Sequence, residues 1–385
     1  MDTVKIGWAG PLYRVVPEGV SISDRYYTMG QHALHGALLA MEEANVRGGY
    51  RGKAPYALVM ANDPAQQVDD TWLWAPFSSD IVDMCYKDHV WALFGSISGE
   101  NTHILLRIAL KVELPVMNST NTDPTFLETR IPWVFRTIAD DRAQCYLLAK
   151  YAYEKTGYKR VAVLRWNGRY GRVGFKEFNE GSRRLGHPLV LEVRYNRGDT
   201  DFSKQLAWVK RRKADALLTW GDDVASALIV KQMQEMGLDI PVMGSDRMVT
   251  DRFLEIAGGA AEGQIVAGYP WNPTRKDPKL LGFRERYQER WDEAVETYAA
   301  HAYDGMNMLI QAIETAGLNR AKIRDALVDI NPYEGVTGTI PFSPIYSDVG
   351  PICLAFVEKG KWVFRTEDEL GIPLSSRLVQ RTETD

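Results

Sequence analysis

Strand and helix patterns alternate along most of this chain, and the alternation restricts its fold more than any other sequence feature. Short apolar runs rich in β-branched residues, such as VKIGWAG, YALVMAND and VWALFG, are separated by stretches with helical spacing. The expected helices are residues 30–45, 100–113, 142–155, 171–185, 202–213, 223–236 and 251–257. Strand then helix, repeated, predicts parallel sheets with helices on both faces. Two such series, separated near Phe135–Asp141, predict two lobes.

The final third of the chain departs from this rhythm. Leu280–Ala316 is predicted to be long helical material, followed by a shorter helix near Ala321–Val328. Two runs typical of antiparallel strands come next, TGTIPF and ICLAFVEKGKWVF, and the turn Glu358–Lys361 predicts a hairpin in the second. Two long stretches that carry aromatic residues, Tyr13–Tyr27 and Thr71–Asp80, are expected to be loops. Long loops in compact domains are often functional.

Composition narrows the class of protein. The fractions of apolar (45%) and charged (25%) residues are those of a soluble globular chain, and its length suggests roughly two to three domains. No run approaches the ~18 consecutive apolar residues of a membrane helix. The start MDTVKIGWAGPL has neither a basic n-region nor an apolar h-region, so we expect any signal peptide to be missing from this sequence. The net charge of −4 gives no electrostatic reason to expect nucleic acid as a partner.

The basic residues and the cysteines predict neither a binding partner nor a metal site. The one basic run, Lys210–Lys213, ends a predicted helix, where cations complement the helix dipole, and we interpret it as a solvated face. Cys85, Cys145 and Cys353 lie far apart and contain no C-x-x-C pair. They therefore form neither a disulfide framework nor a zinc signature.

The stretch ALFGSISGENTHILL, residues 92–106, predicts an anion site. The apolar run before Gly95 fits a buried strand, and Glu100–Leu110 has helical spacing. Only five small or apolar residues, GSISG, separate the two. A helix that begins this way directs backbone N–H groups and hydroxyls at one spot, which suits a carboxylate, a phosphate or an oxyanion.

Enzyme motifs fail in this chain. No G-x-G-x-x-G follows the first strand, GGYRGK is one residue short of a Walker loop, and the candidate nucleophile elbow has Ile97 where a serine is needed. His32 and His35 are three residues apart on a predicted helix, the spacing of a shared metal face, but no acidic or cysteine residue lies near them in sequence. We interpret them as ordinary helix histidines, and no catalytic group, cofactor or metal is predicted.

Several motifs occur in an ordered succession from about Val4 to Phe364. They include IGWAGPL, GQHALHGALLAMEEANVRGGYRGK, NDPAQQ, LFGSISGENT, LPVMNSTNTDPTF, VFRTIADDRAQ, MGSD and AYDGMNMLIQAI. In this order they resemble type I periplasmic binding proteins, most closely the leucine/isoleucine/valine-binding group that serves ABC transporters. The resemblance implies an α/β flytrap fold, with two Rossmann-like lobes joined by three crossovers. The first lobe would be residues 1–138 plus 269–343, and the second 139–268 plus 344–385.

The resemblance also implies a carboxylate site on the first lobe. The family's hydroxyl and amide positions after the third strand fall on Ser98 and Gly99, and those after the next strand fall on Thr120, Asn121 and Thr122. The chemistry fits, because N–H groups at a helix start and a threonine hydroxyl satisfy both oxygens of an amino acid's α-carboxylate.

Contacts to the rest of the ligand are implied in the same way. The acidic residue that meets the α-ammonium would be Asp246, and aromatic cover would come from Tyr170 and Tyr298. Asp223 stands where the family often has an aromatic residue, and Arg247 where a small one is common. The resemblance thus implies a pocket more polar than one built for leucine.

Each of these residues also has a structural interpretation. Ser98 is a suitable cap for its own helix, and Thr120 and Thr122 are suitable turn residues before a proline. Asp246 is a suitable partner for the adjacent Arg247, and the tyrosines are ordinary packing residues. The sequence leaves these alternatives open.

Function follows from the resemblance as an expectation. The chain would be a non-enzymatic, periplasmic or otherwise extracytoplasmic protein that captures an amino acid, of branched-chain type or more polar, in the cleft between its lobes. It would deliver this ligand to an ABC transporter permease, without binding nucleic acid or spanning the membrane. The alternative is a sensor of the same fold for an amide, a urea derivative or an aromatic acid, which the lack of an attached transmitter segment disfavours.

Overall fold

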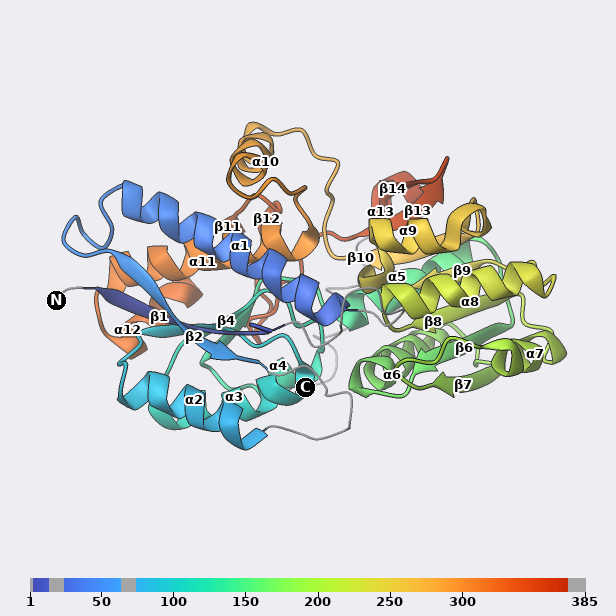
Figure 1. The fold of residues 1–385 in the computed structure, drawn as a ribbon, viewed down its shortest axis with the longest axis horizontal. Helices are drawn as coiled ribbons and strands as arrows, with labels where there is room; N and C mark the ends of the chain where they lie inside the picture. The colour runs from blue at the N-terminus through green and yellow to red at the C-terminus, as the bar shows by residue number, and fades with distance from the viewer. Residues whose placement is uncertain (1–2, 14–23, 64–73, 373–385) are drawn as a thin grey trace. The chain divides into compact units, whose positions relative to one another are not determined.

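The computed structural model describes residues 3–13, 24–63 and 74–372, and its chain divides into two compact units. Of the described residues, unit 1 holds 3–13, Tyr26–Asp140 and Arg275–Gly350, and unit 2 holds 24–25, Asp141–Thr274 and 351–372. Both are built on a sheet flanked by helices (Figure 1). The predicted α/β fold of two units with mainly parallel sheets is confirmed.

Unit 1 contains a parallel sheet of five strands in the order β2-β1-β3-β4-β5. These strands are β1 (Val4–Gly10), β2 (Tyr56–Asn62), β3 (Ala92–Gly95), β4 (Val116–Asn118) and β5 (Val134–Arg136). The helices are α1 (Arg25–Val46), α2 (Trp74–Tyr86), α3 (Gly99–Val112), α4 (Thr125–Glu128), α10 (Pro278–Trp291), α11 (Thr297–Ala316) and α12 (Arg320–Asp329). The antiparallel pair β11 (Tyr333–Glu334) and β12 (Thr339–Ile340) completes the unit.

Unit 2 contains a sheet of seven strands in the order β14-β13-β10-β9-β8-β6-β7. Its strands are β6 (Val161–Trp166), β7 (Leu191–Tyr195), β8 (Ala216–Trp220), β9 (Val242–Gly244), β10 (Ile265–Tyr269), β13 (Cys353–Glu358) and β14 (Lys361–Thr366). Its helices are α5 (Asp141–Lys150), which continues as a π-helix over Tyr151–Lys155, α6 (Arg169–Arg184), α7 (Ser203–Arg211), α8 (Asp223–Glu235), α9 (Asp251–Ala257) and α13 (Glu367–Leu370). The predicted hairpin is confirmed, since β13 and β14 pair antiparallel around the turn at Glu358 and Lys361.

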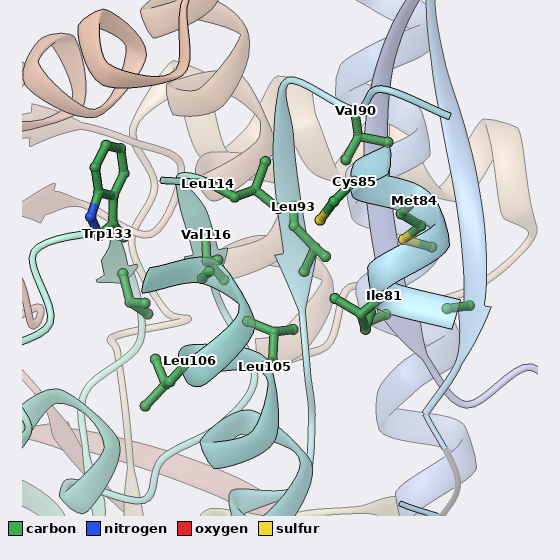
Figure 2. Packing of buried hydrophobic residues seen from close by; sticks show 14 of the residues in the cluster. Ile81, Met84, Cys85, Val90, Leu93, Leu105, Leu106, Leu114, Val116 and Trp133 are labelled. Carbon is green, nitrogen blue, oxygen red and sulfur yellow. The ribbon is translucent and has the colours of Figure 1, made fainter. Parts of the chain in front are cut away.

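Apolar side chains from both layers form the core of unit 1 between the sheet, α2 and α3 (Figure 2). Ile81 and Met84 of α2 pack with Leu93 of β3, Leu105 faces them from α3, and Leu106 of the same helix belongs to the same cluster. All five side chains are at most 2% exposed to solvent. The helical spacing of the apolar residues thus places one stripe of each helix against a strand whose residues are themselves apolar.

One prediction about secondary structure is wrong, and the structure adds detail to another. Of the expected loop Thr71–Asp80, the described part from Trp74 onward is the start of α2. The expected helical stretch Leu280–Ala316 is two helices, because Asp292 adopts a left-handed conformation (φ 53°) that ends α10 before α11 begins. Most of the other expected loop, Tyr13–Tyr27, lies outside the described residues, and its last residues begin α1.

Among the described residues, no helix is both long and apolar enough to cross a membrane. The three cysteines are reduced and buried.

Candidate ligand-binding site

Polar residues of unit 1 gather where β2, β3 and β4 end. Asp63 directly follows β2, Ser96 and Ser98 follow β3, and Asn118 and Thr120 stand at the end of β4. Parallel strands bring their carboxyl ends to the same edge of a sheet, the usual ligand-binding edge of open α/β sheets. The sequence stretch that predicted an anion site therefore lies in a polar neighbourhood built by three strands.

The buried carboxylate of Asp63 organises the segment between β3 and α3. It accepts hydrogen bonds from the Ser96 hydroxyl (2.5 Å), from the backbone N–H of Ile97 (2.8 Å) and from the side-chain amide of Asn101. Burial raises the pKa of Asp63, and these three donors oppose that rise because they favour the charged form. Burial and the nearby Asp63 charge also raise the pKa of Tyr26 on α1.

Ser98 caps the helix that follows it. Its backbone is extended (φ −80°, ψ 144°), and its hydroxyl oxygen accepts a hydrogen bond from the N–H of Asn101 at 3.0 Å. The structural interpretation of Ser98 is therefore confirmed. Since a capping oxygen still carries its own O–H, this hydroxyl keeps a donor for a second partner. Gly99 begins the helix, and N–H groups at that position have no acceptor within the helix itself.

Two asparagines fix the turn after β4. Asn118 donates to the Ser96 carbonyl (2.8 Å) and accepts from the backbone N–H groups of Thr120 (3.1 Å) and Asn121 (2.9 Å). The Asn121 side chain donates to the Thr102 hydroxyl (2.8 Å) and accepts from the N–H of Asp123 (3.0 Å). These bonds join the turn to the start of α3. The Asn121 side chain therefore already stabilises the turn.

Among these polar residues at the ends of β2, β3 and β4, Thr120 has a side-chain hydroxyl without a hydrogen-bond partner in the part of the chain that the structure describes. Its side-chain oxygen is buried and forms no hydrogen bond with any described residue. Thr120 and Thr122 are each 2% exposed. Buried hydroxyls are nearly always hydrogen-bonded, so an unpaired one calls for a partner that the described residues do not provide.

A second polar edge occurs in unit 2, at the carboxyl ends of β6, β8 and β9. Tyr170 lies in the first turn of α6 after β6, Asp223 begins α8 after β8, and Asp246 follows β9. These three strands are neighbours in the sheet. All three side chains are buried, with exposed fractions of 8%, 5% and 0%.

Asp246, Tyr170 and Arg247 form the centre of this edge. The Tyr170 hydroxyl donates to Asp246 Oδ1 at 3.2 Å. The Arg247 guanidinium lies over the Tyr170 ring, 3.5 Å from its centroid, which is a cation–π contact. One face of the Tyr170 ring is therefore covered by Arg247, and the ring also packs against Trp220, with 5.8 Å between the centroids.

Two adjacent carboxylates add negative charge nearby. Asp222 caps α8 by accepting from the N–H of Ala225 (3.0 Å), and Asp223 accepts from the Thr250 hydroxyl (3.2 Å). Burial, followed by the negative charge of Asp223, raises the pKa of Asp222 to about 6, against the lowering effect of Arg197 and Arg247. Desolvated acids of this kind favour a cationic partner.

The remaining expected residues lie elsewhere. Tyr298 stands in the first turn of α11 in unit 1 and is fully buried. His35 approaches Glu293 at 3.0 Å and stacks on Trp291, while His32 lies 3.6 Å from the same carboxylate. Within the described residues, no group of three or more His, Cys, Asp or Glu side chains is arranged to hold a metal ion.

Sequence reasoning gave Asp63, Asn118 and Asp222 no role. Asp63 stands in the NDPAQQ motif and Asn118 in LPVMNST, so both were visible as polar residues directly after a predicted strand. That position at the end of a parallel strand was the available signal.

The sequence matches the periplasmic binding protein family over residues 20–348. Among curated relatives, a Leu/Ile/Val-binding protein homolog from Brucella abortus is 26% identical over 332 residues, covering 85% of each chain. A leucine-, isoleucine-, valine-, threonine- and alanine-binding protein from Pseudomonas aeruginosa is 25% identical over 344 residues, or 89% of this chain and 86% of that one. Among solved structures, a branched-chain amino acid transporter substrate-binding protein from Streptococcus pneumoniae, in complex with isoleucine, superposes with a TM-score of 0.80 at 24% identity and covers 95% of this chain and 99% of that chain.

Proposed function

The chain belongs to the periplasmic binding protein family, and from this premise we propose that it is the substrate-binding protein of an ABC transporter that captures an amino acid outside the cytoplasm. The family and its structural neighbours are binding proteins of transporters and not enzymes. The names of the curated relatives support branched-chain and small amino acids as the ligand class.

The observation that carries the proposal is that each unit has its own polar edge at the carboxyl ends of its parallel strands, rich in neutral donors in unit 1 and in carboxylates in unit 2. In unit 1 the ligand carboxylate would accept hydrogen bonds from the unpaired Thr120 hydroxyl, the Ser98 hydroxyl and the Gly99 N–H, with Thr122 beside them. Neutral donors at a helix start suit an anion because the helix dipole adds partial positive charge there. Asn121 would take part through its backbone, since its side chain is already engaged.

In unit 2 the ligand ammonium would be bound by Asp246, held in place by Tyr170, with the Asp223 carboxylate nearby. Tyr298 would add an aromatic wall from unit 1. A single zwitterion engaging both units would favour a closed arrangement by its differential affinity for that state. A micromolar dissociation constant supplies about 8 kcal/mol, which is ample for such a shift. The closed, loaded protein would then be presented to the permease.

The test is a thermal-shift screen of the purified chain against the twenty amino acids, short amides, urea and aromatic acids, followed by calorimetric titration of each hit. A ligand that binds only the folded state raises the melting temperature. We expect a clear shift with one or more aliphatic or small polar amino acids. A shift confined to amides or to acids without an amino group would keep the fold and overturn the amino acid proposal.

The variant Asp246→Asn separates the ammonium contact from simple folding effects. We expect it to weaken amino acid binding at least tenfold while the protein still melts cooperatively. The matched control is Asp251→Asn, at an exposed position at the start of α9, which removes the same charge from the same unit. Equal affinities of the two variants would remove Asp246 from the site.

A further inference from the structure

A hollow opens on the surface of unit 2, between the beginning of β7 and the end of α7. It has a volume of about 430 Å³ and is lined by Leu191, Trp208, Arg211 and Arg212. Leu191 is the first residue of β7, so the hollow lies toward the amino ends of the parallel strands. The ligand residues proposed above for unit 2 follow the carboxyl ends of β6, β8 and β9 in the same sheet. The two places are therefore at opposite edges of one sheet, and the hollow needs its own explanation.

Trp208 gives the hollow an apolar wall that faces solvent. Its side chain is 36% exposed, and among the described residues of unit 2 it is the one large hydrophobic residue that stands out from the surface. Lys204 lies one turn earlier on α7, with its ammonium 5.5 Å from the Trp208 ring centroid. An exposed indole ringed by cations is unusual on a solvated helix face, because tryptophan is among the residues that bury the most apolar area.

Arg211 and Arg212 supply charge that the fold itself does not use. Both residues are exposed, and in the part of the chain that the structure describes their guanidinium groups form neither an ion pair nor a hydrogen bond. Two carbonyls directly after α7 are bound by Arg160, which donates to the carbonyl oxygens of Arg212 (2.6 Å) and Lys213 (3.0 Å). The interpretation of Lys210–Lys213 as a solvated face is therefore incomplete. Arg160 binds the carbonyls that follow the helix, and the Arg211 and Arg212 side chains line the hollow.

Two acids close in sequence to the lining residues, Asp215 and Glu192, bind other groups of the chain. Asp215 accepts from the backbone N–H groups of Lys159 (2.8 Å) and Arg160 (2.9 Å). Glu192 on β7 pairs with Arg165 at 2.6 Å and with Arg194 at 3.2 Å. Neither carboxylate pairs with Arg211 or Arg212, so these two guanidinium groups have no acidic partner among the described residues, although the whole chain carries a net charge of −4.

We propose that this hollow is a docking site for an acidic segment of a protein partner. An aliphatic side chain of the partner would rest against Trp208 and Leu191, and flanking carboxylates would pair with Arg211 and Arg212. Guanidinium groups bind carboxylates through two parallel hydrogen bonds, and tryptophan and arginine dominate the binding energy of protein interfaces. Charge complementarity favours an acidic partner. The shape of the hollow favours a partner with a protruding side chain, and a flat charged surface would not fill it.

The probe is a fluorescein-labelled peptide in which glutamates flank a single leucine, titrated against the full chain at low ionic strength and followed by fluorescence anisotropy. We expect saturable binding that weakens as salt is added, because exposed charge pairs are screened. The same peptide with glutamine in place of glutamate is expected to lose binding. Anionic vesicles containing phosphatidylglycerol serve as the competing charged surface.

Two variants locate the contact, Trp208→Ala and the double variant R211Q/R212Q. Each of them should lower the affinity for the peptide at least tenfold. The control is K213Q/K231Q, which removes the same charge from exposed lysines of the same unit that do not line the hollow. The arginine and lysine positions are exposed, so the melting temperature of these variants should be unchanged, whereas Trp208→Ala also loses packing because this side chain is only 36% exposed. Equal weakening by the control, absence of saturable peptide binding, or binding to the vesicles but not to the peptide would each overturn the proposal.

Discussion

The Tyr170 hydroxyl and the Asp246 carboxylate, 76 residues apart in sequence, meet in a hydrogen bond of 3.2 Å in the interior of unit 2. The bond joins the first turn of α6 to the segment after β9 and holds one oxygen of a fully buried carboxylate. The ring that carries the hydroxyl is itself fixed by Arg247, 3.5 Å from its centroid. Side chains held this way are preorganised, so a ligand that uses them loses little entropy on binding.

Tyr170→Phe is expected to lower the free energy of unfolding by about 2 kcal/mol, because a hydrogen bond to a charged acceptor is worth roughly 1.5–3 kcal/mol. The matched control is Tyr153→Phe, which removes a buried hydroxyl that donates to the neutral Ser182 oxygen at 3.0 Å. It should cost only about 1 kcal/mol. Urea unfolding of both variants measures the difference, and equal losses would mean that the Asp246 contact has no special weight.

Asp63→Ala is expected to destabilise unit 1 by about 3 kcal/mol and to weaken ligand binding. Three donors from Ser96, Ile97 and Asn101 lose their acceptor in a fully buried place, and buried unpaired donors are costly. Asp63→Asn should cost much less, because its amide still offers an oxygen to Ile97 while the Asn101 amide can rotate to accept. Urea unfolding and ligand titration of both variants check this order, and a larger loss for the asparagine variant would contradict it.

Ser98→Ala tests whether this serine has one role or two. Loss of the cap should lower stability by about 1 kcal/mol. If its O–H also donates to the ligand carboxylate, affinity falls as well, and we expect at least a tenfold loss, because a hydrogen bond to a charged acceptor is worth roughly 1.5–3 kcal/mol. Asn319→Ala is the control, since Asn319 caps α12 in the same unit by accepting from Lys322 at 3.0 Å. Asn319→Ala should lower the free energy of unfolding by a similar amount and leave ligand affinity unchanged. If Ser98→Ala also leaves ligand affinity unchanged, Ser98 acts only as a helix cap.

Local sequence pattern predicted most of the fold because buried parallel strands appear as continuous apolar runs and their helices carry apolar stripes. The early start of α2 was missed because Pro76 and the serines after it resemble a loop, whereas proline is compatible with a first helical turn. The division between α10 and α11 was not predicted because the residue with the left-handed conformation that ends α10 is Asp292, and glycine is the residue that usually signals such a helix end in a sequence.

The candidate site was less predictable because its contacts are long-range. Thr120 and Ser98 were chosen from the resemblance, but that Thr120 keeps an unpaired hydroxyl depends on how Asn118 and Asn121 arrange the turn. Asp63 reaches the Ser96 segment across 33 residues, which no local pattern reveals. The contact of Arg247 with Tyr170 likewise depends on the order of the strands in the sheet, where β8 lies between β6 and β9.

Gly36→Ala is expected to destabilise unit 1 by about 2 kcal/mol or more, because α1 crosses α11 at this residue. A Cβ built on Gly36 would lie 2.1 Å from the carbonyl oxygen of Ala299, so the two helices would have to move apart. Gly259→Ala is the control, since a Cβ there meets no atom within 4 Å. Thermal melting should show a clear decrease for the first and almost none for the second; similar melting temperatures would contradict the close crossing.

His301 is expected to make the protein less stable in mild acid. The residue is buried in α11, and its Nδ1–H donates to the Thr297 carbonyl at 2.7 Å. Burial lowers the pKa of His301 from 6.5 to about 4. Between these two values the unfolded chain binds a proton that the folded chain does not, so stability falls as the pH decreases. The contribution is complete above pH 6.5 and is lost progressively down to pH 4, by about 3 kcal/mol at most.

The measurement is urea unfolding of the parent chain and of His301→Gln at pH 7.5, 5.5 and 4.5. Other groups titrate in this range, and burial raises the pKa of Asp222 and of Asp304 to about 6, which by the same argument makes stability fall as the pH rises from 3.8 to 6. Because both proteins share these groups, the difference between them isolates His301. We expect any advantage of the parent to shrink, and then to reverse, as the pH decreases, whereas a difference that is constant across the three pH values would show that His301 does not titrate in this way.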